Sequence, residues 1–516
     1  MDAPPPRKAV RRLLLGLGAV AAVSLAYLAW RRMDGAPPGP PPARVRGIVL
    51  FCFDTLRQDA FRLPGDPPGE MPVLEALARE SSVFVDATAA CCWTAPSVTT
   101  ILTGLRPVDH GVMTFGQATP LVPAVVTLAE MLHAAGWSTS AATGGGWVAP
   151  EGGLGQGFDR FSVGFDEKGV GVSLAAWDRE RPKDRPFFLF LHTYAAHDPY
   201  GHEAFRHHGV SPVRPAATLS HEDLRAGLER GGGTIPEDLI APFVLQQLTN
   251  TGGRLACQKG LGGPRYKAIW HDCMEWLDGG YAIGHDRVAL EETLRTAYRT
   301  GLPSADDVLR ETFEGLRRIG ILDDVDLLVV GDHGEAFGEH KSLCHGFNLY
   351  DEAIRVPLVL RVRGRALVPR RVTGGCGLID VTPTILELAG VEPATELPGR
   401  SLVALARGGG PGVPIVADME RPNFGALAGA TRTQYVSVRT PKAKWIAGYE
   451  PLSGRITGEQ LFDLATDPGE SRSLPGAGPP PESAGVDFCL AVTRERNRIR
   501  RVAGLPPLEP ACPLKR

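Results

Sequence analysis

Residues 47–54 of this 516-residue chain read Gly-Ile-Val-Leu-Phe-Cys-Phe-Asp, an uninterrupted apolar run that ends in a carboxylate. Such a run is typical of a strand that is buried on both faces of a parallel sheet. Residues 186–192, Pro-Phe-Phe-Leu-Phe-Leu-His, and residues 326–333, Asp-Leu-Leu-Val-Val-Gly-Asp-His, have the same form. Because ligand sites in open α/β sheets lie at the carboxyl ends of the strands, the three runs predict one assembled site.

The rest of the pattern predicts helices around such a sheet. Helical spacing occurs in residues 71–80, 122–135 and 305–319, and residues 356–362 predict a fourth strand. Beyond about residue 405, the segments around Tyr435 and Lys444 indicate a small antiparallel sheet. We therefore expect an α/β fold with a mostly parallel central sheet flanked by helices, and a small C-terminal subdomain.

Composition excludes some classes of protein. The chain is 43% hydrophobic and carries a formal net charge of −3, so it can bury a large core and has no basic field with which to capture nucleic acid. Its nine cysteines lack the paired CxxC spacing of a structural zinc site. If the chain is exported, Cys257 with Cys273 and Cys489 with Cys512 are candidate disulfides, and buried free thiols are the alternative.

The N-terminus predicts a membrane anchor. Residues 1–12 end in Arg-Lys-Ala-Val-Arg-Arg, and the apolar run 13–30 that follows contains no charged residue. The run is just long enough to span a bilayer and precedes no small-x-small cleavage site, so we expect an uncleaved signal anchor with a cytoplasmic N-terminus. The Pro-rich residues 31–45 predict a linker that holds the remaining chain outside the cytoplasm, in the periplasm or at the cell surface. A buried helix and a twin-arginine export signal are the alternatives.

Side chains suited to metal binding and nucleophilic attack follow the predicted strands. Asp54 ends the first strand, and Asp332 and His333 end the third, where they can offer oxygen and nitrogen ligands to one cation. Pro96 predicts the first turn of a helix whose N-terminus suits an anionic ester. Thr94 just before it can then act as a nucleophile, or it can simply cap the helix.

Several histidines lie in the same loops. His192, His197 and His202 follow the second strand, and His345 follows Asp332 and His333 in the same Gly-rich segment. Single histidines are usually structural, but this number at strand ends favours a functional site.

Taken together, these segments resemble the sulfatase and alkaline-phosphatase superfamily. The matching motifs occur in the family order: Asp-Thr-Leu-Arg-Gln-Asp at 54–59, Thr-Ala-Pro-Ser at 94–97, Thr-Gly-Leu-Arg-Pro-Val-Asp-His-Gly at 103–111, Gly-Phe-Asp at 157–159, His-Asp-Pro-Tyr at 197–200, Gly-Asp-His-Gly-Glu-Ala-Phe-Gly-Glu-His at 331–340, Tyr-Asp-Glu-Ala-Ile-Arg-Val-Pro-Leu at 350–358, and Leu-Phe-Asp-Leu-Ala-Thr-Asp-Pro-Gly-Glu at 461–470. The resemblance implies an alkaline-phosphatase-like catalytic domain at 46–404 with an insertion at 202–300, and a C-terminal subdomain and tail at 405–516.

The resemblance also implies a mechanism. The divalent metal ligands would be Asp54, Thr94, Asp332 and His333, with Ca²⁺, Mn²⁺, Mg²⁺ and Zn²⁺ all suited to such donors. Thr94 would be the nucleophile, and His197 and His345 would bind the ester anion and protonate the leaving oxygen. Asp198 and His202, together with His345, resemble a second metal site, although the ordinary sulfatase pattern also accounts for Asp198.

One position departs from the sulfatases that use formylglycine. Those enzymes carry Cys or Ser in Cys-x-Pro-Ser-Arg, whereas this chain has Thr94 and, in place of the Arg, Val98. The segment after Thr143, where those enzymes grip sulfate with a Lys and a His, reads Gly-Gly-Gly-Trp-Val. We therefore expect phosphoester cleavage or transfer through a covalent Thr94 intermediate. Sulfate ester hydrolysis and an anchored, non-catalytic anion-binding protein are the alternatives.

Overall fold

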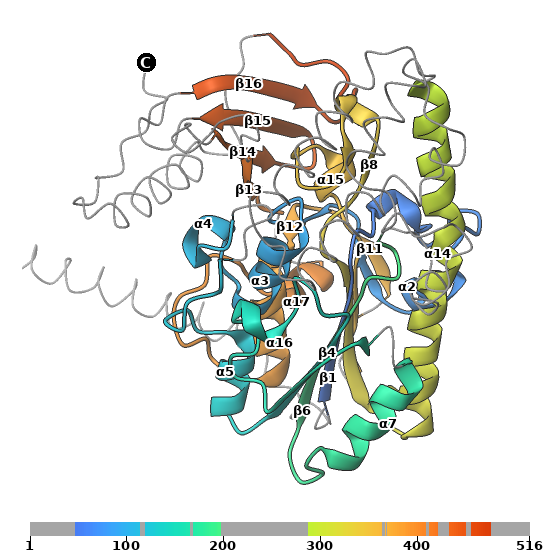
Figure 1. The fold of residues 1–516 in the computed structure, drawn as a ribbon, viewed down its shortest axis with the longest axis vertical. Helices are drawn as coiled ribbons and strands as arrows, with labels where there is room; N and C mark the ends of the chain where they lie inside the picture. The colour runs from blue at the N-terminus through green and yellow to red at the C-terminus, as the bar shows by residue number, and fades with distance from the viewer. Residues whose placement is uncertain are drawn as a thin grey trace, which may run out of the picture. The chain divides into compact units, whose positions relative to one another are not determined.

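The structure, a computed structural model, describes residues 47–113, 119–165, 169–197, 287–363, 367, 369–408, 412–421, 433–449 and 456–475. All of them belong to one compact unit that begins at Arg46. The unit contains an eight-stranded sheet with helices on both faces and a separate four-stranded sheet (Figure 1). The expected α/β architecture is confirmed.

The central sheet has the strand order β11-β2-β10-β7-β1-β6-β4-β5. Its strands are β1 (Gly47–Phe53), β2 (Ser82–Phe84), β4 (Ser138–Thr143), β5 (Arg160–Val163), β6 (Phe187–Thr193), β7 (Val325–Gly331), β10 (Leu358–Arg361) and β11 (Arg370–Val372). Strand β1 lies at the centre and pairs in parallel with β6 and β7, while β10 is antiparallel to both of its neighbours. The parallel pairing brings the carboxyl ends of β1, β6 and β7 to the same edge, as the three apolar runs predicted.

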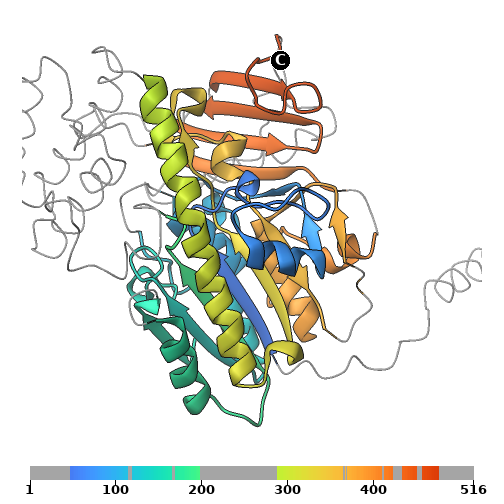
Figure 2. The same ribbon diagram turned by 90° about the vertical axis from the view of Figure 1, so that its right-hand side faces the viewer.

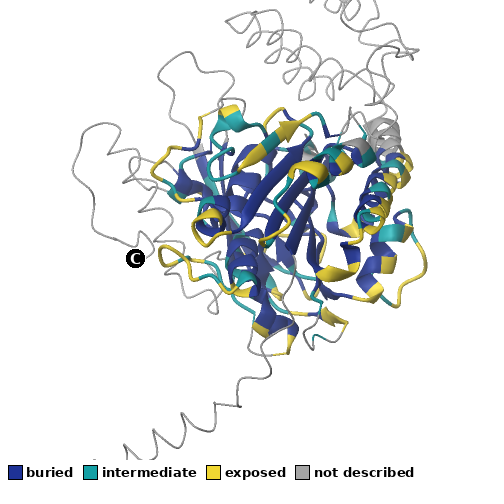
Figure 3. Ribbon diagram, turned by 90° about the horizontal axis from the view of Figure 1, so that it is seen from below, coloured by how far each residue is buried: buried dark blue, intermediate teal, exposed yellow. Residues whose placement is uncertain are grey.

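Alternate residues of β1 face two different hydrophobic clusters, which explains why the run is apolar throughout. Ile48, Leu50 and Cys52 pack with helices α3 (Thr94–Thr103), α5 (Leu128–Ala134), α16 (Val381–Ala389) and α17 (Leu402–Ala406). Val49, Phe51 and Phe53 pack with α2 (Pro72–Arg79), α7 (Val170–Glu180) and α14 (Arg287–Arg318). Figure 2 shows α14 running along its face of the sheet, and Figure 3 shows buried strands between helices whose outer surfaces are exposed.

Short strands and helices complete the region around the central sheet. They are β3 (Ala87–Thr88), β8 (Ala336–Phe337), β9 (Leu343–Cys344), β12 (Cys376–Gly377), α4 (Pro107–His110) and α15 (Asp351–Ile354). The motif at 103–111 has a structural role here, since Gly104 ends α3 with a φ of 67°. The buried His110 lies in the same motif, where its Nδ1 accepts a hydrogen bond from the backbone of Val112 and its Nε2 lies 3.2 Å from Thr100 Oγ1.

The second sheet contains β13 (Ile415–Arg421), β14 (Thr433–Arg439), β15 (Ala443–Tyr449) and β16 (Ile456–Asp463), all antiparallel. A buried charge cluster joins it to α15. Lys444 Nζ lies 2.8 Å from an oxygen of Asp351 and 2.9 Å from one of Glu470, and Arg439 also pairs with Asp351. The predicted C-terminal antiparallel sheet is therefore confirmed, and its attachment is ionic as well as apolar.

Two helices differ from the predicted bounds. The helix expected over 122–135 begins only at Leu128, because Thr127 and Glu130 form a reciprocal capping box there. The helix expected over 305–319 begins at Arg287 and continues through Pro303. A proline removes one helical hydrogen bond, but Leu302 and Ala305 on either side are fully buried, so packing compensates for the loss.

Some predictions fall on residues outside the described ranges. These are the anchor at 13–30, the linker at 31–45, both candidate disulfides, and most of the insertion at 202–300, of which 287–300 belongs to α14. Within the described ranges, none of the helices has the length and apolarity needed to cross a membrane.

Candidate metal and nucleophile site

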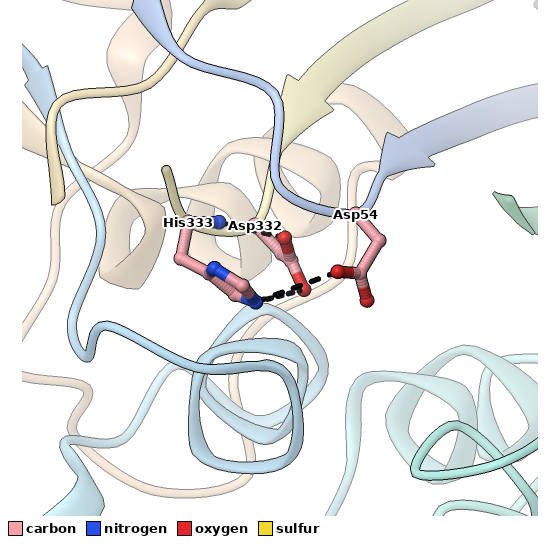
Figure 4. Close-up of side chains that lie close together, drawn as sticks. All are labelled: Asp54, Asp332 and His333. Atoms are coloured by element: carbon pink, nitrogen blue, oxygen red, sulfur yellow. Dashed lines mark hydrogen bonds and ion pairs between the residues drawn. The ribbon is translucent and has the colours of Figure 1, made fainter. Parts of the chain in front are cut away.

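Three buried side chains converge at the carboxyl edge of the sheet. Asp54 directly follows β1, and Asp332 and His333 directly follow β7, the strand beside it. Figure 4 shows the three side chains pointing toward one another. Their ligand atoms all lie within 4.8 Å of one another, with His333 Nε2 3.5 Å from Asp54 Oδ1 and 3.6 Å from Asp332 Oδ2. The structure thus brings together three of the four residues that the sequence predicted as metal ligands.

The nucleophile candidate lies against the same cluster. Thr94 is the first residue of α3, and its Oγ1 donates a hydrogen bond to Asp54 Oδ2 over 3.0 Å and lies 3.3 Å from His333 Nε2. The residue at the helix N-cap is Trp93, so the alternative that Thr94 serves as the cap is wrong. Ser97, one turn further on, donates a hydrogen bond to the carbonyl of Asp332 over 2.5 Å and ties the helix start to the end of β7.

The backbone fixes the orientation of each ligand. Asp332 Oδ1 accepts hydrogen bonds from the N–H groups of Thr55 and His333, over 3.1 and 2.7 Å, which leaves Oδ2 for the site. Thr55 itself has a φ of 55°, in the left-handed region that is uncommon for a β-branched residue. His333 Nδ1 lies 2.9 Å from the carbonyl oxygen of Gly334, which only accepts, so Nδ1 carries the proton and Nε2 presents its lone pair.

The donor set fits a divalent cation. Asp54 Oδ1 and Asp332 Oδ2 are buried and, within the described part of the chain, accept no hydrogen bond. Together with His333 Nε2 and Thr94 Oγ1 they form a cluster of lone pairs with a single hydroxyl proton among them. Two donors that share one ion at about 2.1 Å lie about 3.0–4.2 Å apart. The distances from His333 Nε2 to Thr94 Oγ1, Asp54 Oδ1 and Asp332 Oδ2, at 3.3, 3.5 and 3.6 Å, fall in this range. Burial without a cation would leave two carboxylates to repel each other.

The pKa shifts of the three ligands agree with a site for a divalent cation. Burial and the nearby charge of Asp54 raise the pKa of Asp332 well above its ordinary value. Burial lowers the pKa of His333 to about 3, so its imidazole is neutral, as a metal ligand must be. For Asp54, burial opposes ionisation, but His192 and the other nearby histidines hold its pKa below the ordinary range.

Two further predicted residues border this cluster. His197 Nε2 lies 4.0 Å from Asp54 Oδ1, and its ring centroid is 5.0 Å from that of His345. The His345 ring is also 4.7 Å from the ring of His333. Both His197 and His345 are partly exposed, at 13% and 14% of their side-chain surface, so they line the open side of the site. Asp198 and His202 lie outside the described residues, and the second metal site stays a prediction.

Two partners of the site received no specific role from the sequence. His192, the sixth residue of β6, is fully buried with Nε2 3.4 Å from Asp54 Oδ2. Glu335 is also fully buried and accepts a hydrogen bond from His345 Nδ1 over 3.1 Å. His192 was visible as a polar residue at the end of a strand and Glu335 as part of the 331–340 motif, but only the fold shows what each one contacts.

Comparison with known proteins agrees with the geometry. The sulfatase family profile matches residues 46–167 and 173–391. Choline-sulfatase of Rhizobium meliloti (strain 1021) is 32% identical over 181 residues, which cover 35% of this chain and 33% of that protein. The multifunctional alkaline phosphatase superfamily protein PehA of Trinickia caryophylli is 35% identical over 120 residues, 23% of each chain. The aligned segments thus span a third or less of the length of these curated relatives.

Solved structures cover more of the chain. BT4656, determined in complex with its substrate D-glucosamine-2-N,6-O-disulfate, superposes with a TM-score of 0.59 at 19% identity, covering 89% of this chain and 98% of that one. Phosphonate monoester hydrolase of Agrobacterium radiobacter has a TM-score of 0.56 at 17% identity, covering 89% and 95%. At these identities the similarity establishes a shared fold.

Proposed function

The chain belongs to the sulfatase family, and we propose that it is a metal-dependent hydrolase or transferase that cleaves a phosphoester through a covalent Thr94 intermediate. The observation that carries the proposal is the position of Thr94 Oγ1, within 3.0 Å of Asp54 Oδ2 and 3.3 Å of His333 Nε2. A hydroxyl in contact with two metal-type ligands at the start of a helix is placed for attack on an anionic ester.

The four donors Asp54, Thr94, Asp332 and His333 would hold the divalent ion. When bound, that ion would lower the pKa of the Thr94 hydroxyl and neutralise charge on the ester oxygens. The N-terminus of α3 adds backbone N–H groups with positive partial charge beside the same hydroxyl. Asp54 keeps the Thr94 oxygen at the centre of the site through their hydrogen bond.

His345 and His197 are the groups available for proton transfer to the leaving alcohol. Glu335 binds His345 Nδ1, so the other ring nitrogen is the one that can give up or accept a proton at the substrate. The same carboxylate would stabilise the imidazolium form. Both rings are partly exposed beside the buried ligand cluster, which places them between the metal ligands and solvent.

The side chain of Thr94 favours phosphorus over sulfur as the atom attacked. The formylglycine of related sulfatases acts as an aldehyde hydrate, which can expel the anion by elimination. Threonine has one hydroxyl on its β-carbon and cannot do so. The intermediate must therefore be released by a second attack, by water or by an acceptor alcohol, at the phosphorus or sulfur atom. Sulfate ester hydrolysis remains the second candidate, because relatives such as choline-sulfatase are named for it.

Turnover of three matched aryl esters tests the proposal. The full chain is assayed on a phosphodiester, a phosphomonoester and a sulfate ester with the same aryl group, across Ca²⁺, Mn²⁺, Mg²⁺ and Zn²⁺, with Thr94→Ala alongside. Metal-dependent phosphoester turnover that is lost in Thr94→Ala supports the proposal. Turnover of the sulfate ester alone would replace it with the second candidate, and turnover of none would favour a binding protein.

We also propose that residues 13–30 anchor the chain with its catalytic part outside the cytoplasm. The basic residues before an uncharged apolar run support this orientation. Protease added to spheroplasts, whose cytoplasmic membrane is intact and whose outer envelope is open, should then digest the catalytic part. Complete protection in spheroplasts together with digestion after lysis would contradict the orientation.

A further inference from the structure

The turn that follows β4 reaches the same sheet edge as the metal ligands. Thr143, the last residue of β4, is the register partner of His192, which contacts Asp54. Gly144 N–H continues this pairing by donating to the carbonyl of His192 over 3.0 Å. The following residues, Gly145, Gly146 and Trp147, therefore leave the sheet beside the strand that carries His192.

Several hydrogen bonds hold the turn in one conformation. Thr143 Oγ1 donates to the carbonyl of Val148 over 2.6 Å and accepts from Gly145 N–H over 3.2 Å. Val148 N–H in turn donates to the carbonyl of Gly145 over 3.0 Å. Gly145 and Gly146 have φ values of 83° and 61°, which a residue with a side chain rarely adopts. The sequence Gly-Gly-Gly-Trp thus encodes a fixed turn that presents a single side chain.

Tyr194 links this turn to the histidines of the site. Its hydroxyl donates to the carbonyl of Gly145 over 2.9 Å and accepts from Trp147 N–H over 3.2 Å. The same ring packs edge-on against His192 and His197, with centroids 4.8 and 5.5 Å apart. One buried side chain therefore contacts both Trp147 and a predicted catalytic histidine, which places the turn at the rim of the site.

The indole of Trp147 is held against a neighbouring ring and is still partly exposed. Its ring packs at 87° against the buried ring of Trp93, with centroids 5.6 Å apart, and Trp93 directly precedes Thr94. Even so, 39% of the Trp147 surface is exposed. Val163, which ends the neighbouring strand β5 and is also exposed, faces the same turn, since a Cβ placed on Gly145 would lie 3.6 Å from it. The rim formed by Trp147 and Val163 is apolar.

We propose that Trp147 selects the alcohol half of the substrate by stacking on an apolar ring face, either an aryl ring or the face of a sugar. The proposal rests on the function given above. The turn offers no charged side chain to the ester anion, and the N–H groups of Gly144, Gly145, Trp147 and Val148 already donate hydrogen bonds within the protein. The indole is therefore the part of the turn that is free to contact the group that departs. A planar indole gains from contact with another ring and gains little from a short alkyl chain.

Binding of two uncleavable anions tests this without requiring turnover. Phenylphosphonate and methylphosphonate are titrated calorimetrically into the full chain with a divalent metal present. The Trp147→Ala and Trp147→Met variants should lose about tenfold in affinity for phenylphosphonate, a typical effect of removing one stacked aromatic, and stay within about twofold for methylphosphonate. Trp147→Phe should retain most of the preference. Leu474→Ala, which changes an exposed apolar residue after β16, is the matched control and should change neither affinity.

Equal losses for both ligands, or no loss for either, would overturn the proposal. The methionine variant keeps an apolar contact on Trp93, so the test survives if the alanine variant is unstable. With esters that are turned over, kcat/KM for phenyl and pyranosyl substrates then identifies which ring Trp147 recognises. If the protein cleaves none of the esters but still prefers phenylphosphonate in a Trp147-dependent way, the proposed function is contradicted. The proposed ring-binding site is then still supported.

Discussion

Thr94 Oγ1 donates a hydrogen bond to Asp54 Oδ2 over 3.0 Å, although the two residues are 40 positions apart. The contact exists because the end of the central strand β1 meets the first residue of helix α3, and Ser97 ties the same helix to the end of β7. A threonine hydroxyl is thereby held among two carboxylates and a neutral imidazole. Its reactivity and the affinity of the site for metal should depend on the same few side chains.

Metal binding should stabilise the fold through Asp332. In the wild type, a divalent ion at about 100 times its Kd should raise Tm by about 3–8 °C. Asp332→Asn should lose most of this rise, yet without metal its Tm should stay close to that of the wild type. The amide oxygen can still accept the hydrogen bonds of Thr55 and His333. Thermal unfolding with and without metal provides the readout, and an undiminished metal effect in the variant would contradict the ligand assignment.

Glu335 should act on proton transfer through His345. Glu335→Gln keeps an acceptor for His345 Nδ1 but removes the negative charge that stabilises imidazolium. We expect kcat to fall about 10–100-fold for esters of weakly acidic alcohols and less than about threefold for 4-nitrophenyl esters, which need no acid. His345→Gln should show the same dependence on the leaving group, more steeply. Equal losses for all leaving groups would assign Glu335 a purely structural role.

The extent to which the sequence predicted the fold depended on burial. The strands β1, β6 and β7 were found within a residue of their observed bounds, because a strand covered by helices on both faces is an unbroken apolar run. The first half of α14 was not predicted, since residues up to 300 were assigned to the insertion. There, packing against the sheet overrides local propensity.

The residues of the site were also predictable only in part. Asp54, Asp332 and His333 could be predicted because each follows a strand whose position the apolar pattern gives, and Thr94 because Pro96 marks the start of a helix. The roles of His192, Glu335 and Tyr194 depend on contacts across strands and loops, which residue spacing does not encode. The turn carrying Trp147 was read as a departure from the sulfatase pattern, but its approach to the site became visible only through Tyr194.

His340 should make stability dependent on pH. Burial alone would lower the pKa of His340, but its hydrogen bond to Glu352 and the carbonyl of Glu470 raise it above the ordinary value of 6.5. A raised pKa in the folded state means that the stabilisation is fully present below about pH 6.5 and is lost as the pH rises through the folded value. The stability advantage of the wild type over His340→Gln should therefore shrink between about pH 6 and pH 9. Urea midpoints at both pH values measure it, and an advantage that grows with pH would contradict the assignment.

Lys444 should be required to attach the C-terminal sheet. It is fully buried between Asp351 and Glu470, so Lys444→Met leaves both carboxylates short of a counter-charge and should cost about 3–5 kcal/mol in the free energy of unfolding. Lys442→Met, two residues earlier and exposed, is the matched control and should cost less than about 0.5 kcal/mol. Chemical denaturation of the three proteins compares them, and equal effects of the two substitutions would show that the buried cluster adds nothing.

The most direct test of the central claim is to trap the covalent intermediate. The full chain is mixed with an activated aryl phosphodiester and metal, quenched in acid within the first turnover, digested and mapped by tandem mass spectrometry. The account predicts that the Thr94 oxygen displaces one aryloxide, so that the phosphoryl group with its remaining ester is found on Thr94. This adduct should be retained at that position in Thr94→Ser and absent in Thr94→Ala. Turnover by Thr94→Ala at the wild-type rate, or an adduct on any other residue, would contradict it.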